Sequence, residues 1–370
     1  MDEGVISLAS WMGDLSSSIS SQPLANIILP GSHDACAFKL SPTELAPFAP
    51  TAAKSCCVQR CCCCATLNFS LAQSADLEKQ LMVGSRYLDM RVTYDVKKKC
   101  LRTEHSLYGL PIRDLLAQVS AFISNYPSEI VILHLRHFSI DQYYDMTPEH
   151  HAMIVQLLQE IFDHETFVLR DELRLPLSVL KERKRSILIL YGTTGKDGDN
   201  VVETLDWIHF QKSVLPGGVG WCNTQTPQDL VSTASAFVDK QHEHSWNMYK
   251  VAVANTPDDQ LIKRGLLNCI FCCCCRVLCR RRCFRPAGLK DLSDDAGDLM
   301  VDMYTDMVRD RKRINIIDMD HVNRQQKRCN LMERIVRLNV RQSSWLESRQ
   351  QEIGMDTAIT VGFTVGGEKE

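Results

Sequence analysis

The chain has 370 residues, of which 45% are hydrophobic, 7% aromatic and 24% charged. This composition is typical of a folded globular protein and excludes the disordered, collagen-like and coiled-coil classes. Its 42 basic and 45 acidic residues give a net charge of −3, so no overall positive field favours nucleic acid as a partner. The length fits two ordinary domains or one α/β barrel.

The N-terminal sequence lacks the basic segment and the apolar run of about 7–15 residues that a secretory signal requires. No apolar run approaches the roughly 18 residues that would span a bilayer. Asp2 stands where N-myristoylation requires glycine. We therefore expect a cytoplasmic protein in a reducing compartment.

Strand-like and helix-like patterns alternate along the chain. The predicted strands cover residues 24–30, 86–92, 100–105, 130–137, 186–191, 248–254 and 313–320. Helices are predicted from Ser74 to Gly84, from Pro111 onward and from Thr147-Pro148 onward, because a capping residue or proline precedes apolar residues at helical spacing. Strands separated by helices predict parallel βαβ units, and their number predicts an α/β fold, a single-domain TIM-type barrel of regular or irregular form.

The barrel domain is expected over residues 1–345, with Cys-rich insertions at about 50–66 and 268–286. Residues 346–370 are expected to form a partly flexible C-terminal extension, since their end is polar and rich in glycine. Each insertion follows a predicted strand, so both should lie at the barrel mouth, where the loops after the strands gather.

The chain has 17 cysteines, and the insertions hold two clusters of them that could contact a membrane: Cys61, Cys62, Cys63 and Cys64, and Cys272, Cys273, Cys274 and Cys275. An odd count and adjacent positions disfavour a disulfide framework. The clusters also lack the paired Cys-x-x-Cys spacing of a zinc ribbon. Because arginines surround the second cluster, S-acylation and peripheral attachment to an anionic membrane are favoured. A metal site and an insertion without a role stay open as alternatives.

Polar side chains recur with a period of two where predicted strands end, so the members of each pair share a face. Three such pairs and two adjacent ones occur: Asp89 and Arg91, His134 and Arg136, Asp318 and Asp320, His33 and Asp34, and Glu104 and His105. One pair alone would indicate only a solvated strand end. Five pairs directed at one barrel mouth predict a site instead.

Two histidines, acidic partners and arginines together suit the cleavage of a phosphodiester. One imidazole can accept a proton from an attacking hydroxyl while the other protonates the leaving alkoxide. Guanidinium groups stabilise charge on phosphate oxygens, and a carboxylate behind each histidine fixes its tautomer.

Several motifs carry a family resemblance: residues 29–34 (LPGSHD), 86–92 (RYLDMRV), 102–105 (RTEH), 221–224 (WCNT) and 315–323 (NIIDMDHVN). In this order they resemble the X domain of phosphatidylinositol-specific phospholipases C. The likeness is greatest to the small eukaryotic X-domain-containing proteins, and it extends more loosely to the trypanosomal glycosylphosphatidylinositol phospholipase C. It covers roughly residues 10–340.

The resemblance implies roles for the histidines and the acids beside them. His33 resembles the general base that deprotonates the inositol 2-hydroxyl, and His105 resembles the general acid that protonates the diacylglycerol oxygen. Asp34 would support His105. Asp320 would support His33, with Asp318 as a rival for that position.

The resemblance also implies how the substrate is held and what replaces a metal. Arg91 stands where calcium-dependent members place an Asp ligand, and Arg136 where they place a Glu ligand, so no metal or other cofactor is expected. Asp89 should orient Arg91. Arg136 is a substrate-contact candidate, and Trp221 and Tyr191 could line an inositol pocket, although core packing suits both of them equally.

The implied activity is cleavage of phosphatidylinositol or glycosylphosphatidylinositol at a membrane surface, giving diacylglycerol and inositol 1,2-cyclic phosphate. A non-catalytic inositol-lipid-binding module is one alternative. A metal-dependent barrel phosphodiesterase acting on glycerophosphodiesters or sphingomyelin is another. The head-group preference and the oligomeric state stay open.

Overall fold

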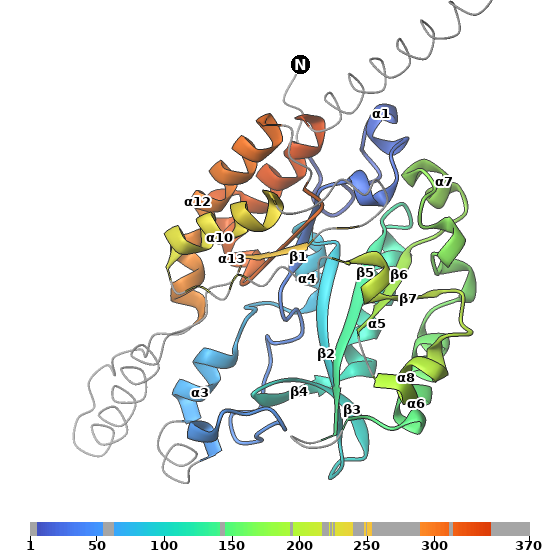
Figure 1. Ribbon diagram of the computed structural model, residues 1–370, viewed down its shortest axis with the longest axis vertical. Helices are drawn as coiled ribbons and strands as arrows, with labels where there is room; N and C mark the ends of the chain where they lie inside the picture. Colours follow the sequence, from blue (N-terminus) through green and yellow to red (C-terminus); the bar gives the residue numbers. More distant parts are fainter. Residues whose placement is uncertain are drawn as a thin grey trace, which may run out of the picture.

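The computed structural model describes residues 6–54, 63–140, 145–192, 195–216, 222, 224, 226–239, 248, 250–253, 289–310 and 314–341. Within these residues, one curled sheet of parallel strands forms the centre of the molecule, with helices around it (Figure 1). The strands along the sheet are, in order, β7 (Ile208–Phe210), β6 (Ile187–Tyr191), β5 (Val131–Ser139), β2 (Tyr87–Asp95), β1 (Leu29–Ser32), β9 (Ile316–Met319) and β8 (Lys250–Val253). This is the arrangement of an irregular α/β barrel, and it confirms the predicted fold class.

A hairpin extends the sheet at the end of β2. Strand β3 (Cys100–His105) pairs antiparallel with β2, and β4 (Leu107–Pro111) pairs antiparallel with β3. The sequence predicted β3 as one more parallel strand and did not predict β4 or β7. Residues 24–30 also differ from the predicted strand, because η1 (Leu24–Asn26) is a 3-10 helix and β1 starts only at Leu29.

Helices cover the outer faces of the sheet (Figure 1). Their bounds are α1 (Ser17–Ser20), α3 (Cys63–Ser70), α4 (Leu77–Met82), α5 (Ile112–Asn125), α6 (Pro148–Ile161), α7 (Leu177–Glu182), α8 (Gly195–Val202), α9 (Gln211–Val214), α10 (Pro227–Asp239), α12 (Leu289–Arg309) and α13 (Val322–Cys329), with helical backbone also over 331–341. The cluster behind β2, β5 and β6 includes α4, α5 and α6, and the cluster behind β8 and β9 includes α10, α12 and 331–341. Within the described residues, no helix is both long and apolar enough to cross a bilayer.

The period of two along each strand separates a barrel interior from an outer core. Tyr87 and Ile132 belong to the interior cluster, whereas their neighbours Leu88 and Leu133 pack against the outer helices. The interior is apolar where the strands begin and becomes polar two residues further on, as at Asp89 and His134. The apolar half is therefore a packed plug beneath a polar mouth.

The two ends of the curled sheet, β7 and β8, are joined by a different contact from the strand pairing that forms the rest of the barrel wall. A backbone hydrogen bond of 2.9 Å from Met248 N to Val214 O joins the segment after β7 to the segment before β8. Gly31 lies at a crowded point of the wall, since a Cβ there would be 3.1 Å from the Tyr87 ring and 3.3 Å from the Ile317 carbonyl oxygen. Glycine at this position lets β1 approach both of its neighbours closely.

Candidate active site

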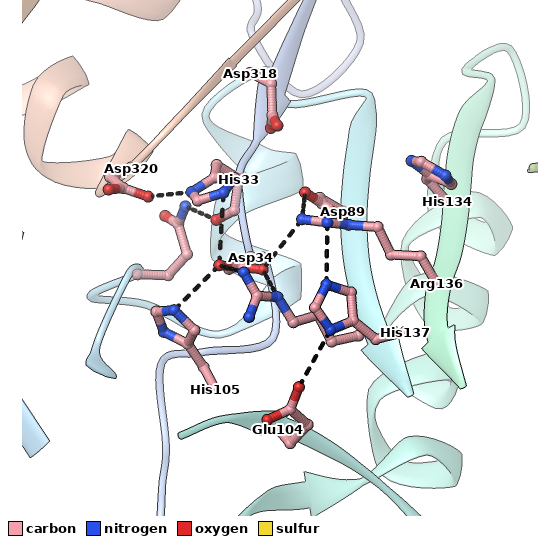
Figure 2. Close-up of polar contacts among 12 residues, drawn as sticks. His33, Asp34, Asp89, Glu104, His105, His134, Arg136, His137, Asp318 and Asp320 are labelled. Atoms are coloured by element: carbon pink, nitrogen blue, oxygen red, sulfur yellow. Dashed lines mark hydrogen bonds and ion pairs between the residues drawn. The ribbon is translucent and has the colours of Figure 1, made fainter. Parts of the chain in front are cut away.

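Polar residues from the ends of β1, β2, β3, β5 and β9 converge at the barrel mouth (Figure 2). The register explains this convergence, because Asp89 is paired with His134 and Arg91 with Arg136, and all four follow the apolar interior positions by two or four residues. The structure thus brings residues from all five of the predicted pairs to this end of the barrel.

His33 is held from two directions. Its Nδ1 lies 2.8 Å from Asp320 Oδ1, and its backbone oxygen accepts a hydrogen bond of 2.8 Å from Gln73 Nε2. Burial alone would lower the pKa of His33, but the carboxylates of Asp34 and Asp320 outweigh it and raise this pKa to about 9. His33 therefore carries a proton near neutral pH in the free protein.

Asp34 lies at the centre of the site, at a backbone φ of 40°. Its Oδ1 lies 2.5 Å from Arg91 Nε and 3.5 Å from Arg136 Nη2. Its Oδ2 lies 3.5 Å from His33 Nε2 and 3.4 Å from His105 Nε2. Burial opposes the charge on Asp34, but Arg91 and then the two histidines hold its pKa well below the usual range. One carboxylate therefore faces both histidines and both arginines.

His105 is oriented by the backbone of the preceding loop. Its Nδ1 lies 2.6 Å from the carbonyl oxygen of Ser70, the last residue of α3, so Nδ1 carries a proton and Nε2 points to Asp34. Burial lowers the pKa of His105, and Arg91 lowers it further against the opposing effect of Asp34. In the free protein one proton is therefore held preferentially on His33 rather than on His105.

A second set of charges lies beneath the first, inside the barrel. Asp89 accepts a bidentate ion pair from Arg136, with Arg136 Nη2 2.5 Å from Asp89 Oδ2. Lys250 Nζ lies 3.2 Å from Asp89 and 2.7 Å from Asp318, and it sits 4.9 Å from the centroid of the Tyr87 ring. Asp89 was expected to orient Arg91. That expectation is wrong, because Asp89 forms its ion pair with Arg136, and Arg91 forms its ion pair with Asp34.

Lys250 is the residue of this set that sequence reasoning missed. It is 1% exposed and begins an otherwise apolar strand, Lys-Val-Ala-Val. A lysine that starts a buried strand is a detectable signal, because a fully buried lysine requires a partner. Asp318, the expected rival of Asp320, pairs with Lys250, so the two acids at the end of β9 have separate contacts.

The groups of this site that reach solvent are basic. The side chains of Arg91, Arg136 and His105 are 17–18% exposed, whereas those of Asp34 and Asp89 are at most 1% exposed. A ligand entering the mouth therefore meets guanidinium and imidazole groups first. This arrangement suits the oxygens of a phosphate group.

A divalent metal fits these residues poorly. His33, Asp34 and Asp89 could each offer one ligand atom, and these atoms lie within 4.8 Å of one another. Both carboxylates are, however, already held by guanidinium groups, Asp34 by Arg91 and Asp89 by Arg136. A divalent ion placed there would lie against these fixed positive charges.

Other predicted residues lie away from the mouth. Tyr191 is fully buried and stacks on Phe138 with ring centroids 4.5 Å apart, so the expectation that it lines an inositol pocket is wrong. Trp221 and the cysteines 61, 62 and 272–275 lie outside the described residues, as does the extension 346–370. The backbones of Cys63 and Cys64 form the first turn of α3.

His134 and His137 differ in their surroundings. His134 is buried between the Tyr87 hydroxyl at 2.5 Å and Gln211 Oε1 at 2.9 Å, and burial lowers its pKa to about 3. This neutral imidazole is part of the barrel packing. His137 lies at the rim, with Nδ1 3.6 Å from Glu104 Oε1 (Figure 2).

Comparison with known proteins identifies relatives of this chain, although no family model matches it. The human PI-PLC X domain-containing protein 3 is 24% identical over 279 residues, covering 71% of this chain and 79% of that protein. The mouse PI-PLC X domain-containing protein 2 is 30% identical over 191 residues, which is 50% of this chain and 53% of the relative. This chain thus spans about half the length of the mouse relative.

Two solved bacterial structures have a fold similar to that of this chain. The phosphatidylinositol-specific phospholipase C from Listeria monocytogenes aligns over 90% of this chain and 99% of its own, with a TM-score of 0.58 and 14% sequence identity. The enzyme from Staphylococcus aureus covers 85% of this chain and 91% of its own, with a TM-score of 0.51 and 13% identity. The resemblance predicted from the motifs is confirmed: the chain is similar in sequence to the PI-PLC X domain-containing proteins, and its fold is similar to the barrel of bacterial phosphatidylinositol-specific phospholipases C.

Proposed function

We propose that this chain is a phosphodiesterase that cleaves phosphatidylinositol or glycosylphosphatidylinositol to diacylglycerol and inositol 1,2-cyclic phosphate. One observation carries the proposal. His33 Nε2 and His105 Nε2 lie 3.5 Å and 3.4 Å from the same oxygen of Asp34, with Arg91 and Arg136 beside them. Two imidazoles that face the same point beside two guanidinium groups can provide the base and the acid for one in-line displacement.

The proposed reaction uses the inositol ring as its own nucleophile. His33 Nε2 accepts the proton of the 2-hydroxyl, and that oxygen forms a bond to phosphorus. The bond from phosphorus to the glycerol oxygen breaks, and His105 Nε2 donates a proton to that leaving oxygen. Asp320, 2.8 Å from His33 Nδ1, stabilises the imidazolium that forms.

In the proposed mechanism the guanidinium groups stabilise negative charge on the phosphate, the role that a metal ion would otherwise have. Arg91 and Arg136 face the mouth while their other contacts hold them to Asp34 and Asp89. A side chain fixed in this way can stabilise the growing charge on the phosphate oxygens with little reorganisation. Because these two charges occupy the mouth, the proposed mechanism requires no metal ion.

Turnover in excess chelator is the direct test. We expect wild-type protein to release diacylglycerol from phosphatidylinositol vesicles equally well with and without chelator. His33→Ala and Arg91→Ala should each lose at least ~10²-fold, the usual size of a general base or a charge-stabilising contact. Activity that chelator abolishes and calcium restores would contradict the metal-free mechanism. Vesicle binding without any turnover, on plain or glycosylated substrate, would instead identify a lipid-binding module.

The proton distribution predicts the pH dependence. The productive form has a neutral His33 and a protonated His105, the reverse of the resting distribution. We therefore expect a bell-shaped profile of kcat/KM: the rate falls at low pH because both histidines are charged, and it falls above about pH 9 because both are neutral.

Asp320→Asn tests this assignment. Removing the carboxylate charge lowers the pKa of His33, so the alkaline limb should move to lower pH. Asp171→Asn, a change of the same kind on the 3-10 helix η4 (Arg170–Glu172), is the matched control and should leave the limb in place. An alkaline limb that stays near pH 9 in Asp320→Asn would show that His33 does not set it.

Membrane attachment through the Cys-rich insertions belongs to the same proposal. Helix α3 begins at Cys63 and ends at Ser70, whose carbonyl oxygen holds His105. An insertion held at the lipid surface would therefore lie one helix away from the proton donor. Peripheral binding through two or more acyl chains is stable, whereas one chain binds only marginally.

Replacing Cys61 to Cys64 and Cys272 to Cys275 by serine should move the protein from the membrane fraction to the soluble fraction. The matched control replaces Cys36, Cys100, Cys222 and Cys329, which lie outside the two clusters, by serine. Fractionation after expression in eukaryotic cells, with labelling of acyl chains, makes the measurement. A cluster variant that stays on membranes would contradict the anchoring proposal.

A further inference from the structure

A third histidine, His137, lies at the mouth beside the two that the proposed reaction uses (Figure 2). Its side chain is 30% exposed, and its Nδ1 lies 3.6 Å from Glu104 Oε1. On the other side of the ring, its Nε2 lies 3.3 Å from Arg136 Nη1. The imidazole therefore lies between a carboxylate and one of the two guanidinium groups that the proposed reaction places beside the phosphate.

The backbone of β5 is distorted where it carries this imidazole. Arg91 of β2 is paired with Arg136 of β5, and the next recorded pair is Thr93 with Ser139, so β5 has one residue more than β2 in this interval. His137 lies in that interval and has a φ of 77°, a value that non-glycine residues rarely adopt. Bulges of this kind redirect side chains next to functional sites, and such strain persists only where the surrounding structure maintains it. The distortion thus places His137 at the mouth.

Glu104 is a buried acid that the proposed reaction does not otherwise use. Its side chain is 0% exposed, and within the described part of the chain neither of its carboxylate oxygens forms a hydrogen bond. Burial would raise the pKa of Glu104, but His137 and then Arg91 outweigh it and lower this pKa. A buried carboxylate in its charged form requires a donor or a cation nearby. Glu104 therefore favours a proton on the ring nitrogen of His137 that faces it, Nδ1.

A proton on Nδ1 leaves Nε2 as the acceptor of the neutral imidazole, and Nε2 faces Arg136. The guanidinium of Arg136 has five N–H donors. Its Nε and Nη2 donate to Asp89, and Nη2 also lies 3.5 Å from Asp34 Oδ1. The contact with His137 Nε2 uses one of the two N–H groups on Nη1. Among the described contacts, the second N–H on Nη1 is the donor that remains for a phosphate oxygen.

We propose that Glu104 and His137 are positioning residues for Arg136. Glu104 holds the Nδ1–H tautomer of His137, and His137 Nε2 fixes the Nη1 group that meets the phosphate. Neither residue touches the reacting atoms. This inference rests on the proposed function, because that function assigns Arg136 to the phosphate. A guanidinium displaced by about 1 Å would stabilise the developing charge less well.

The variants His137→Leu and His137→Gln test the contact with Arg136. Both carry the same strained backbone, but only the glutamine side chain has an oxygen that can accept a hydrogen bond from Nη1. His137→Leu should slow the cleavage of phosphatidylinositol by at least ~10-fold, and His137→Gln should restore most of the rate. Thermal unfolding of each variant checks that the fold is retained. Equal rates of the two variants would contradict a role that depends on an acceptor at this position.

The same substitution in an Arg136→Ala background distinguishes positioning from general support of the mouth. If His137 acts through the guanidinium, His137→Leu should change the remaining rate by less than about twofold, because the group that it positions is absent. A further loss of ~10-fold in that background would show that His137 supports the mouth independently of Arg136, and would overturn the proposal.

Nitrogen NMR of isotope-labelled histidines tests the same contacts without turnover. At about pH 8 the ring of His137, identified by its absence from the spectrum of His137→Gln, should be the Nδ1–H tautomer. Its Nε2 resonance should shift in Arg136→Ala, which removes the donor, and the Nε2–H tautomer should appear in part in Glu104→Leu. A wild-type ring in the Nε2–H form, or an Nε2 resonance that stays unchanged in Arg136→Ala, would overturn the proposal. If the spectra agree with it but wild type releases no diacylglycerol, the proposed hydrolysis fails while the placement of Arg136 by His137 stands.

Discussion

His105→Ala should slow the cleavage of phosphatidylinositol by ~10²–10⁴-fold but slow a substrate with a good leaving group far less. The diacylglycerol oxygen leaves as a poorly stabilised alkoxide, so it needs the proton that His105 Nε2 supplies. A nitrophenyl ester of inositol phosphate leaves as a stable anion and needs no such proton. His33→Ala removes the base that both substrates require, so this variant should lose both activities.

The ratio of the two rates is therefore the informative quantity. Each variant is measured with both substrates, and thermal unfolding of each checks that the fold is retained. His164→Ala, on the 3-10 helix η3 (His164–Thr166), is the matched control and should leave both rates unchanged. If His105→Ala slowed both substrates equally, His105 would not be the proton donor. If His33→Ala spared the good leaving group, the two roles would be reversed.

The polar mouth could be predicted because a strand repeats its faces every two residues. In β2 and β5 the interior positions run from Tyr87 to Asp89 and from Ile132 to His134, so apolar and polar interior layers follow from spacing alone. The contact between His33 and Asp320 also agrees with expectation. The expectation of that contact came from the family resemblance, whereas the polar layer followed from the spacing along each strand.

The partners within the mouth could not be predicted in the same way. Asp34, Asp89, Arg91 and Arg136 are all within reach of one another, and only three-dimensional geometry decides which carboxylate each guanidinium binds. The left-handed backbone of Asp34 turns its carboxylate toward both histidines and both arginines at once. A sequence pattern gives no information on such a turn at a non-glycine residue.

Two other features differ from the sequence predictions: the position of Tyr191 and the presence of strand β7. Tyr191 occupies an outward position of β6 and packs among the helices, and its phenol oxygen meets His151 Nδ1 at 2.8 Å. Strand β7 has only three residues, too few to show any periodicity. Tyr191 and β7 both lie in the wall of the barrel. There, the face of the strand on which a side chain lies, and not its residue type, decides whether it reaches the mouth.

Lys250→Met should be the most destabilising single change at this site. Lys250 is buried between Asp89 and Asp318, and its loss leaves buried carboxylate charge without that partner. Removing one member of a buried ion pair typically costs about 3–5 kcal/mol of unfolding free energy. Urea unfolding at pH 8 should show this loss, because Asp318 is ionised there in the unfolded chain.

The pH dependence of that loss distinguishes unpaired charge from lost packing. Burial raises the pKa of Asp318 to about 6 even with Lys250 in place, and removing this cation raises it further. Since the folded-state pKa then exceeds the unfolded value, the folded variant takes up a proton as the pH falls and gains stability relative to the unfolded chain. The stability difference from wild type should therefore be smaller at pH 5 than at pH 8.

Lys250→Met/Asp318→Asn is the matched variant, because it removes one of the charges left without their cation. It should recover part of the lost stability at pH 8 and change less between pH 8 and pH 5. If instead the double variant were no more stable than Lys250→Met at either pH, the lost contact of Lys250 Nζ with the Tyr87 ring, and not the charge left on Asp318, would account for the effect.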